Sequence, residues 1–107
     1  MTSADRAGAV PPRSGRVVVA LPSVLAALAG SSRVELSVPH DARLSDVLDS
    51  LVMACPAVER RIRNETGDLR RYVNVYVDGH DVRGMGGVAA AVRSGSEVRV
   101  IASVAGG

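Results

Sequence analysis

The sequence predicts a single α+β domain in which a mixed sheet of about four to five strands covers one main helix. Three observations lead to this expectation. The chain has 107 residues, which is enough for one compact domain and too few for two. Apolar residues make up 47% of the chain, so a hydrophobic core can form. Valine-rich segments with strand periodicity lie on both sides of one segment with helical periodicity, which indicates a sheet packed over a helix.

The first expected elements form a hairpin. Residues 1–15 are rich in Ala, Gly, Pro and Ser, and we expect a disordered N-terminal arm there. A strand is predicted from Arg16 to Leu21 (RVVVAL), because β-branched residues favour strands and Pro22 ends the run. The segment from Ser23 to Gly30 is long enough for a short helical turn. Apolar and polar residues alternate from Arg33 to Val38, which predicts a second strand antiparallel to the first.

One segment shows clear helical periodicity. Its apolar residues follow the i, i+3, i+4, i+7, i+8 spacing, and they are Leu44, Val47, Leu48, Leu51 and Val52. Asp46 and Asp49 lie in its first turns, where negative charge complements the helix dipole. Pro56 stops or kinks the helix, a further turn is expected over Ala57 to Arg63, and a loop follows over Asn64 to Asp68.

The second half of the chain supplies the remaining strands. The segment from Tyr72 to Asp81 (YVNVYVDGHD) has the strongest strand pattern and contains the two-residue turn Asp78-Gly79. A short return strand is expected near Asp81 to Arg83, and a short helical turn over Val88 to Val92. Glu97 to Ile101 (EVRVI) is the last predicted strand. This order of elements is the β-grasp arrangement, expected over residues 16–102, with a flexible Gly-Gly tail over residues 103–107.

No enzymatic or metal site is predicted. Cys55 is the only cysteine, which excludes an internal disulfide and a multi-cysteine metal centre. It follows an apolar stripe, so we expect a buried, inert thiol rather than a nucleophile. His40 and His80 have no ligand-type partner three or four positions away, and both are expected to be exposed. The glycine-rich segment from Gly84 to Gly87 lacks the lysine of a phosphate-binding loop.

The distribution of charge argues against nucleic acid as a partner. All 13 basic residues are arginine, and three of them precede the first apolar run against one acid. The other ten arginines are balanced by ten acids, so the folded part lacks the positive excess that phosphate binding requires. Because there is no lysine, the chain also offers no side-chain amine for a Schiff base or an isopeptide bond.

Five arginines crowd one stretch of twelve residues around the predicted loop. They are Arg60, Arg61, Arg63, Arg70 and Arg71. The favoured interpretation is a solvated face that follows a helix. The alternative is a docking patch for an acidic partner.

The apolar run from Val17 to Ala29 loosely resembles a secretory signal peptide. Pro22 and Ser23 interrupt it, however, and cleavage would remove a predicted core strand. The run is also shorter than the ~20 residues of a membrane helix. We therefore expect a cytoplasmic protein that has no membrane partner, with secretion as the alternative.

The chain ends in Gly106-Gly107 directly after the last predicted strand. Glycine has no Cβ, so such an end can enter a narrow channel and bring its carboxylate close to another protein. A carboxylate can be activated as an acyl-adenylate without catalytic residues in its own chain. The alternative for this dipeptide alone is a frayed glycine terminus.

Two long segments, RYVNVYVDGHDVR and SGSEVRVIASVAGG, carry a resemblance to a known family. Together with LPSVLAALAG and LSDVLDSL, they resemble the ubiquitin-like sulfur-carrier family. Its members include the small subunit of molybdopterin synthase, the thiamine sulfur carrier and the actinobacterial cysteine-biosynthesis carrier (MoaD, ThiS and CysO). The resemblance covers about residues 16–107 and is strongest to the cysteine-type branch, through VNVYV and the VAGG ending.

The resemblance implies a specific role for the tail. Gly107 would be adenylated with ATP by an E1-like enzyme, and a sulfurtransferase or rhodanese domain would convert it to a thiocarboxylate. Val104, Ala105, Gly106 and Gly107 would enter the active sites of partner enzymes, while the chain itself binds no cofactor. The chain would thus be a protein substrate and sulfur donor rather than an enzyme.

The resemblance also implies which enzymes use the sulfur. In the cysteine-type branch, the acceptor is a pyridoxal-phosphate enzyme of the cysteine-synthase type, and a zinc JAB-type metallopeptidase frees the product. Another thiolating enzyme of specialised metabolism is a further possible acceptor. In the molybdopterin branch, the tail enters a large catalytic subunit, which is the less favoured role here. The alternatives from other classes are a β-grasp interaction module with an inert tail and an enzyme that uses Cys55.

Two features depart from the family pattern. Members often have proline shortly before the tail, whereas this chain has Ile101-Ala102-Ser103-Val104. The N-terminal arm is also longer than the family core requires, and it receives no role. Neither feature changes Gly106-Gly107.

Overall fold

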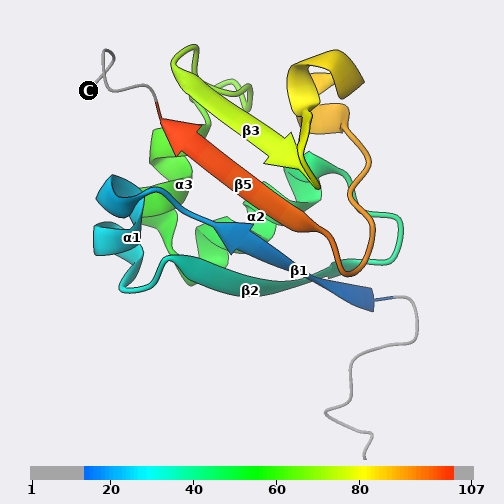
Figure 1. Cartoon of the computed structure of the whole chain (residues 1–107), viewed down its shortest axis with the longest axis horizontal. Helices are drawn as coiled ribbons and strands as arrows, with labels where there is room; N and C mark the ends of the chain where they lie inside the picture. The colour runs from blue at the N-terminus through cyan, green and yellow to red at the C-terminus, as the bar shows by residue number, and fades with distance from the viewer. Residues whose placement is uncertain (1–13, 103–107) are drawn as a thin grey trace, which may run out of the picture.

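The computed structural model describes residues 14–102, which form a mixed five-stranded sheet with helices packed against it (Figure 1). The strands are β1 (Ser14–Ala20), β2 (Arg33–Pro39), β3 (Val73–Val77), β4 (His80–Asp81) and β5 (Glu97–Ala102). The helices are α1 (Ser23–Ala29), α2 (Leu44–Ala54) and α3 (Pro56–Ile62), with 3-10 turns η1 (Val82–Met85) and η2 (Gly87–Ala89). The strand order is β2-β1-β5-β3-β4, and only β1 and β5 pair in parallel. The predicted α+β class and β-grasp arrangement are confirmed.

The expected hairpin of the first two strands is confirmed. β1 pairs antiparallel with β2 along its whole length, from Ser14 opposite Pro39 to Ala20 opposite Arg33. β1 begins two residues before the predicted start at Arg16, so Ser14 and Gly15 belong to the sheet and not to the arm. Strand propensity near a glycine is weak, but cross-strand pairing with β2 extends the strand through it. The rest of the expected arm, residues 1–13, lies outside the described residues.

Gly15 is buried at a point of close approach, and this leads to a stability prediction. A Cβ added at Gly15 would lie 2.5 Å from the Cβ of Ser94. Gly15→Ala is therefore expected to destabilise the fold by about 1–3 kcal/mol, because the backbone must shift to relieve the clash. Gly84→Ala is the matched control, since a Cβ there meets nothing within 4 Å. Chemical denaturation of both variants checks this, and equal midpoints for the two would contradict it.

The core lies between the sheet and α2. The helical stripe is confirmed at its first four positions, because Leu44, Val47, Leu48 and Leu51 are fully buried. Facing them are valines of three strands, namely Val17, Val19, Val73, Val75, Val98 and Val100. Asp46 lies in the first turn of α2 as expected, and it also caps the helix, since its Oδ2 accepts the backbone N–H of Arg43 at 2.8 Å.

Pro56 separates α2 from α3 as predicted. Cys55 leaves helical geometry, with φ −157° and ψ 84°, because the residue before a proline is excluded from it. Pro56 then occupies the first turn of α3. Backbone N–H groups in the first turn of a helix have no carbonyl partner within the helix, so a residue without an N–H is tolerated there. α3 covers the expected segment Ala57 to Arg63 apart from its last residue, and Val58 and Ile62 join the core.

Two short elements differ from the sequence prediction. The return strand is β4, His80–Asp81, and it does not extend to Arg83. The Asp81 carboxylate accepts the backbone N–H of Arg83 at 2.9 Å and turns the chain into η1. The second difference is at η2, which ends before the expected turn over Val88 to Val92 is complete. Ala91 pairs with Arg43 instead, so a long-range bridge replaces the local helical turn.

The turn between β3 and β4 is held to the start of β5 by the Asp78 carboxylate. Asp78 has a φ of +49°, as the predicted turn requires, and its Oδ1 accepts the backbone N–H of Glu97 at 2.9 Å. That hydrogen bond and a second from the Ser96 side chain lower the pKa of Asp78.

A carboxylate with a lowered pKa in the folded state stabilises the fold above its ordinary pKa. This contribution is lost as the pH falls through the lower, folded-state pKa. We expect the wild type to lose stability more steeply than Asp78→Asn in this acidic range. Asparagine keeps the positive φ and an oxygen acceptor but cannot be protonated there. Urea denaturation at a series of acidic pH values checks this, and parallel profiles for the two proteins would contradict it.

Candidate functional site

The predicted site residues Val104, Ala105, Gly106 and Gly107 lie outside the described residues. What the structure shows is the strand from which they continue. β5 lies between β1 and β3, and its Val98 and Val100 are buried in the core. Its last residue, Ala102, pairs with Val73 at the start of β3. The segment that carries the tail therefore begins at a fixed place in the middle of the sheet.

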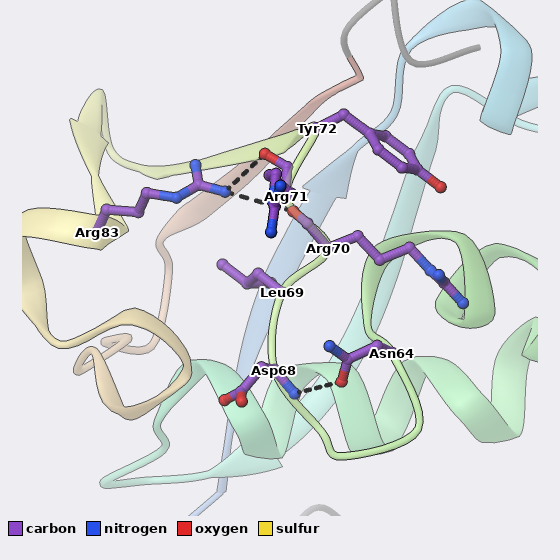
Figure 2. Close-up of a pocket in the computed structure, with 7 residues that line it drawn as sticks. All are labelled: Asn64, Asp68, Leu69, Arg70, Arg71, Tyr72 and Arg83. Atoms are coloured by element: carbon purple, nitrogen blue, oxygen red, sulfur yellow. Dashed lines mark hydrogen bonds between the residues drawn. The ribbon is translucent and has the colours of Figure 1, made fainter.

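A side chain from η1 fixes the backbone just before β3. The Arg83 guanidinium donates to the carbonyl oxygen of Val73 at 2.8 Å and to the Asn74 Oδ1 at 2.6 Å. It also donates to the carbonyl oxygens of Arg70 and Arg71, both at 3.3 Å (Figure 2). Arg83 thus holds the segment that pairs with the end of β5. No sequence pattern singles out Arg83, since only tertiary structure brings its side chain to these carbonyl oxygens.

A network of charges lies on the exposed face of β5. Glu97 forms ion pairs with Arg33 of β2 at 3.0 Å and with Arg99 at 3.1 Å. The hydrogen bond from Arg33, followed by that from Arg99, lowers the pKa of Glu97. Ile101, the next outward residue of β5, is 44% exposed, so an apolar side chain lies in the open beside the last described residue. The outward face of β5 thus combines a closed set of ion pairs with one exposed apolar side chain next to Ala102.

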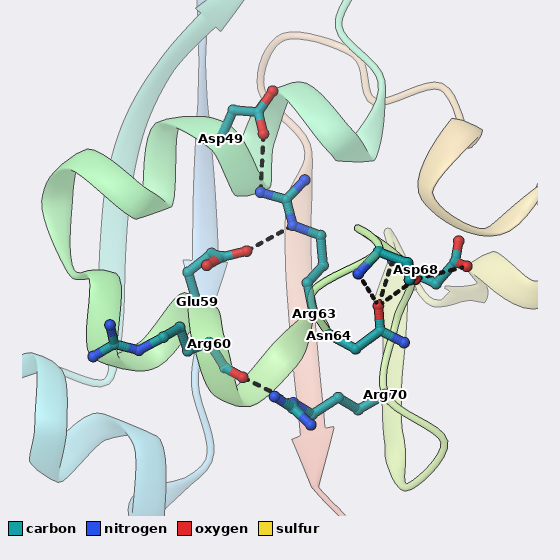
Figure 3. Close-up of polar contacts among 8 residues, drawn as sticks. Asp49, Glu59, Arg60, Arg63, Asn64, Asp68 and Arg70 are labelled. Atoms are coloured by element: carbon teal, nitrogen blue, oxygen red, sulfur yellow. Dashed lines mark hydrogen bonds and ion pairs between the residues drawn. The ribbon is translucent and has the colours of Figure 1, made fainter.

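An open, basic hollow of about 550 Å³ lies next to the start of β3. We call it the arginine hollow, and it is lined by residues 69–72, Asn64, Asp68 and Arg83 (Figure 2). Three of its lining side chains are arginines, namely Arg70, Arg71 and Arg83, against one carboxylate, Asp68. The Arg70 Nε donates to the carbonyl oxygen of Arg60 at 2.8 Å, which directs that side chain toward α3 (Figure 3).

The five crowded arginines do not form one solvated face, which corrects the favoured interpretation. The Arg63 side chain is only 11% exposed and donates to Glu59 at 2.7 Å and to Asp49 at 2.9 Å (Figure 3). Desolvation by burial lowers the pKa of Arg63, but the two carboxylates outweigh it, so the pKa is raised and the guanidinium stays charged. Arg60 and Arg61 are exposed on α3. Arg70 and Arg71 belong to the arginine hollow instead.

The remaining candidate residues are not brought together. His40 and His80 are exposed, as predicted. Cys55 is half-buried against the core, and its Sγ lies 3.8 Å from the carbonyl oxygen of Leu28. Among residues 14–102, no three His, Cys, Asp or Glu side chains are grouped as a metal ion would require. Within the same range, no helix is both long and apolar enough to cross a bilayer.

Comparison with known proteins matches the chain to the model of the ThiS family over residues 19–107. The chain is 39% identical over 83 residues to small archaeal modifier protein 1 of Haloferax volcanii. That alignment covers 78% of this chain and 91% of the archaeal protein. It is 33% identical over 93 residues to the sulfur carrier protein CysO of Mycobacterium tuberculosis. That alignment covers 85% of this chain and 98% of CysO.

Solved structures show the same similarity. In the crystal structure of the BexX/CysO complex of Amycolatopsis orientalis, the matched chain is 32% identical to this one and superposes with a TM-score of 0.75. The alignment covers 85% of this chain and 99% of that one. The family match extends to residue 107, so it includes the Gly-Gly end.

Proposed function

Because the chain belongs to the ThiS family of ubiquitin-like sulfur carriers, we propose that Gly107 is converted to a thiocarboxylate that donates sulfide to a biosynthetic acceptor. A carrier of this family is a substrate of partner enzymes and not a catalyst. The observation that carries the proposal is the family match through residue 107, in a chain whose central strand ends five residues earlier at Ala102.

The chemistry needs no catalytic group from this chain. A carboxylate oxygen of Gly107 attacks the α-phosphorus of ATP in the activating enzyme, and pyrophosphate leaves. Hydrosulfide then attacks the acyl carbon, and AMP leaves. Where the partner holds the sulfur as a cysteine persulfide, the terminal sulfur attacks instead, and a second thiol cleaves the resulting acyl disulfide, which releases the thiocarboxylate and leaves a disulfide on the partner's cysteine. The product keeps sulfur nucleophilic at the end of a chain that can carry it into a water-excluding pocket. In this scheme ATP is consumed by the activating enzyme and the carrier binds no cofactor.

The proposed partners follow from the family. The activating partner is an E1-like adenylating enzyme with sulfurtransferase or rhodanese activity. The acceptor we favour is a pyridoxal-phosphate enzyme of the cysteine-synthase type or another thiolating enzyme, with a zinc JAB-type metallopeptidase to free the product. The similarity to CysO over 98% of that protein's length supports this choice over the small subunit of molybdopterin synthase.

A second candidate function is protein modification, in which the activated Gly107 carboxylate is joined to an amine of another protein. The 39% identity to a protein named as a small archaeal modifier favours it. The chain has no lysine of its own, so chains linked through lysine cannot form. Thiocarboxylate formation without protein conjugates, in an extract that contains the partners, would separate sulfur donation from modification.

ATP–pyrophosphate exchange tests the first step. With a cognate E1-like enzyme, exchange of label between pyrophosphate and ATP is expected to depend on this chain and to saturate with its concentration. Exchange that is independent of the chain, with each E1-like enzyme of the same cell, would contradict the proposal and favour a β-grasp interaction module with an inert tail.

A further inference from the structure

We infer that the arginine hollow is a docking site for an acidic surface segment of the enzyme that activates Gly107. The inference rests on the proposed function and adds the surface through which the enzyme recognises the folded domain. Of the five arginines expected as an alternative docking patch, only Arg70 and Arg71 line the hollow, and Arg83 joins them from η1. Arg60, Arg61 and Arg63 lie outside the lining of the hollow.

The length of the tail places the enzyme over this end of the sheet. Five residues follow Ala102, and a fully extended chain of that length reaches roughly 17 Å. An enzyme that binds the Gly107 carboxylate in its active site must therefore bring part of its surface within that distance of Ala102. Ala102 pairs with Val73, and Tyr72, directly before it in the chain, lines the hollow. The hollow is thus inside the area that the enzyme can cover.

Arg71 is the guanidinium that the hollow offers to a partner carboxylate, with Arg70 at its edge, because Arg83 already donates to Asn74 and to three carbonyl oxygens. Within residues 14–102, neither Arg70 nor Arg71 forms an ion pair, whereas Arg16, Arg33, Arg63 and Arg99 all do. The Arg70 Nε donates to the carbonyl oxygen of Arg60, which holds the guanidinium toward α3 at the edge of the hollow, and its two terminal nitrogens form no hydrogen bond within residues 14–102 (Figure 2). A guanidinium with paired N–H groups binds a carboxylate at two points, so acidic side chains complement this surface.

The shape of the hollow favours a protein surface over a small ligand. Pockets for small molecules are mostly apolar and enclose their ligand, whereas this hollow is open and its lining is polar. Tyr72, which is 42% exposed at its edge, is a residue type enriched where proteins meet. Arg83 holds the carbonyl groups of Arg70 and Arg71, so this part of the surface is ordered before a partner arrives.

The test compares two arginines that receive the same change of charge. Arg71→Glu reverses an exposed charge in the hollow, and Arg93→Glu reverses an exposed charge near Ser94, at the end of the sheet where β5 begins. Neither arginine forms an ion pair within residues 14–102. The measurement is ATP–pyrophosphate exchange with the cognate E1-like enzyme as a function of carrier concentration, at low and high salt.

Arg71→Glu is expected to raise the half-saturating carrier concentration about tenfold, with the maximal rate unchanged and the difference smaller at high salt. Arg93→Glu should stay within about twofold of the wild type. Equal half-saturation for Arg71→Glu and Arg93→Glu would overturn the inference. A second outcome would also overturn it: inorganic phosphate at low millimolar concentration inhibits exchange with the wild type but not with Arg71→Glu, although both proteins half-saturate the enzyme at the same concentration. That outcome would assign the hollow to a small anion. If the wild type itself supports no exchange, the proposed function fails before this comparison is reached.

Discussion

Deleting Gly107 is expected to abolish thiocarboxylate formation and to leave the folded domain intact. The deletion moves the terminal carboxylate back by about 3.5 Å, the length of one extended residue. A misplacement of about 1 Å at a reacting centre can cost about 100-fold in rate, so we expect a loss of at least about 100-fold in adenylation. Every buried core residue of the described range lies between Val17 and Val100, so the unfolding midpoint should not change.

Two controls make this result specific to the position of the carboxylate. Extension of the chain by one glycine keeps the terminal chemistry but moves the carboxylate forward, and it should also lower the adenylation rate. Ser103→Ala keeps the length, precedes the four residues expected to enter the active site, and should retain most of the rate. Full adenylation of the shortened chain would contradict the role of Gly107.

Glu59→Ala is expected to cause the largest loss of stability among the polar substitutions considered. Glu59 is 9% exposed, and its carboxylate accepts from the Arg63 Nε at 2.7 Å. Removing it leaves a nearly buried guanidinium with Asp49 as its remaining partner, and loss of one member of a buried pair costs about 3–5 kcal/mol. Because Asp49 still compensates part of the charge, we expect about 3 kcal/mol from denaturation curves.

Two further variants separate burial from simple ion pairing. The Asp49 side chain is 68% exposed, so Asp49→Ala should cost about 1 kcal/mol or less. In the double variant Glu59→Met/Arg63→Met, no buried charge remains, and the stability should return to within about 1 kcal/mol of the wild type. A cost of Glu59→Ala no larger than that of Asp49→Ala would contradict the account.

Periodicity was sufficient to predict the elements that the core defines. The spacing of Leu44, Val47, Leu48 and Leu51 predicts α2, because the same side chains that define the pattern are those buried against the sheet. Alternation predicts β2 and β3 for the same reason. The short elements after β4 were placed less well, because a side-chain hydrogen bond of Asp81 and the bridge of Ala91 to Arg43 decide them. Neither leaves a periodic signal in the sequence.

The surface around the tail could be predicted only in part. The crowding of arginines was visible in the sequence, but its division into a buried pair at Arg63 and a basic hollow at Arg70 and Arg71 was not. That division depends on which helical face α3 turns toward Asp49 and on the contacts of Arg83, which lies 13 residues after Arg70 and 12 after Arg71. The Gly-Gly end itself was recognised from sequence alone, and its role stays a prediction.

The most direct test of the central claim is the intact mass of the full chain after incubation with ATP, a cognate E1-like enzyme and a sulfide source. We expect a mass gain equal to the exchange of one oxygen for one sulfur, with fragmentation placing it at Gly107. An unchanged mass, under conditions in which the same enzyme converts another carrier of the family, would contradict the assignment of Gly107 as the sulfur-bearing residue.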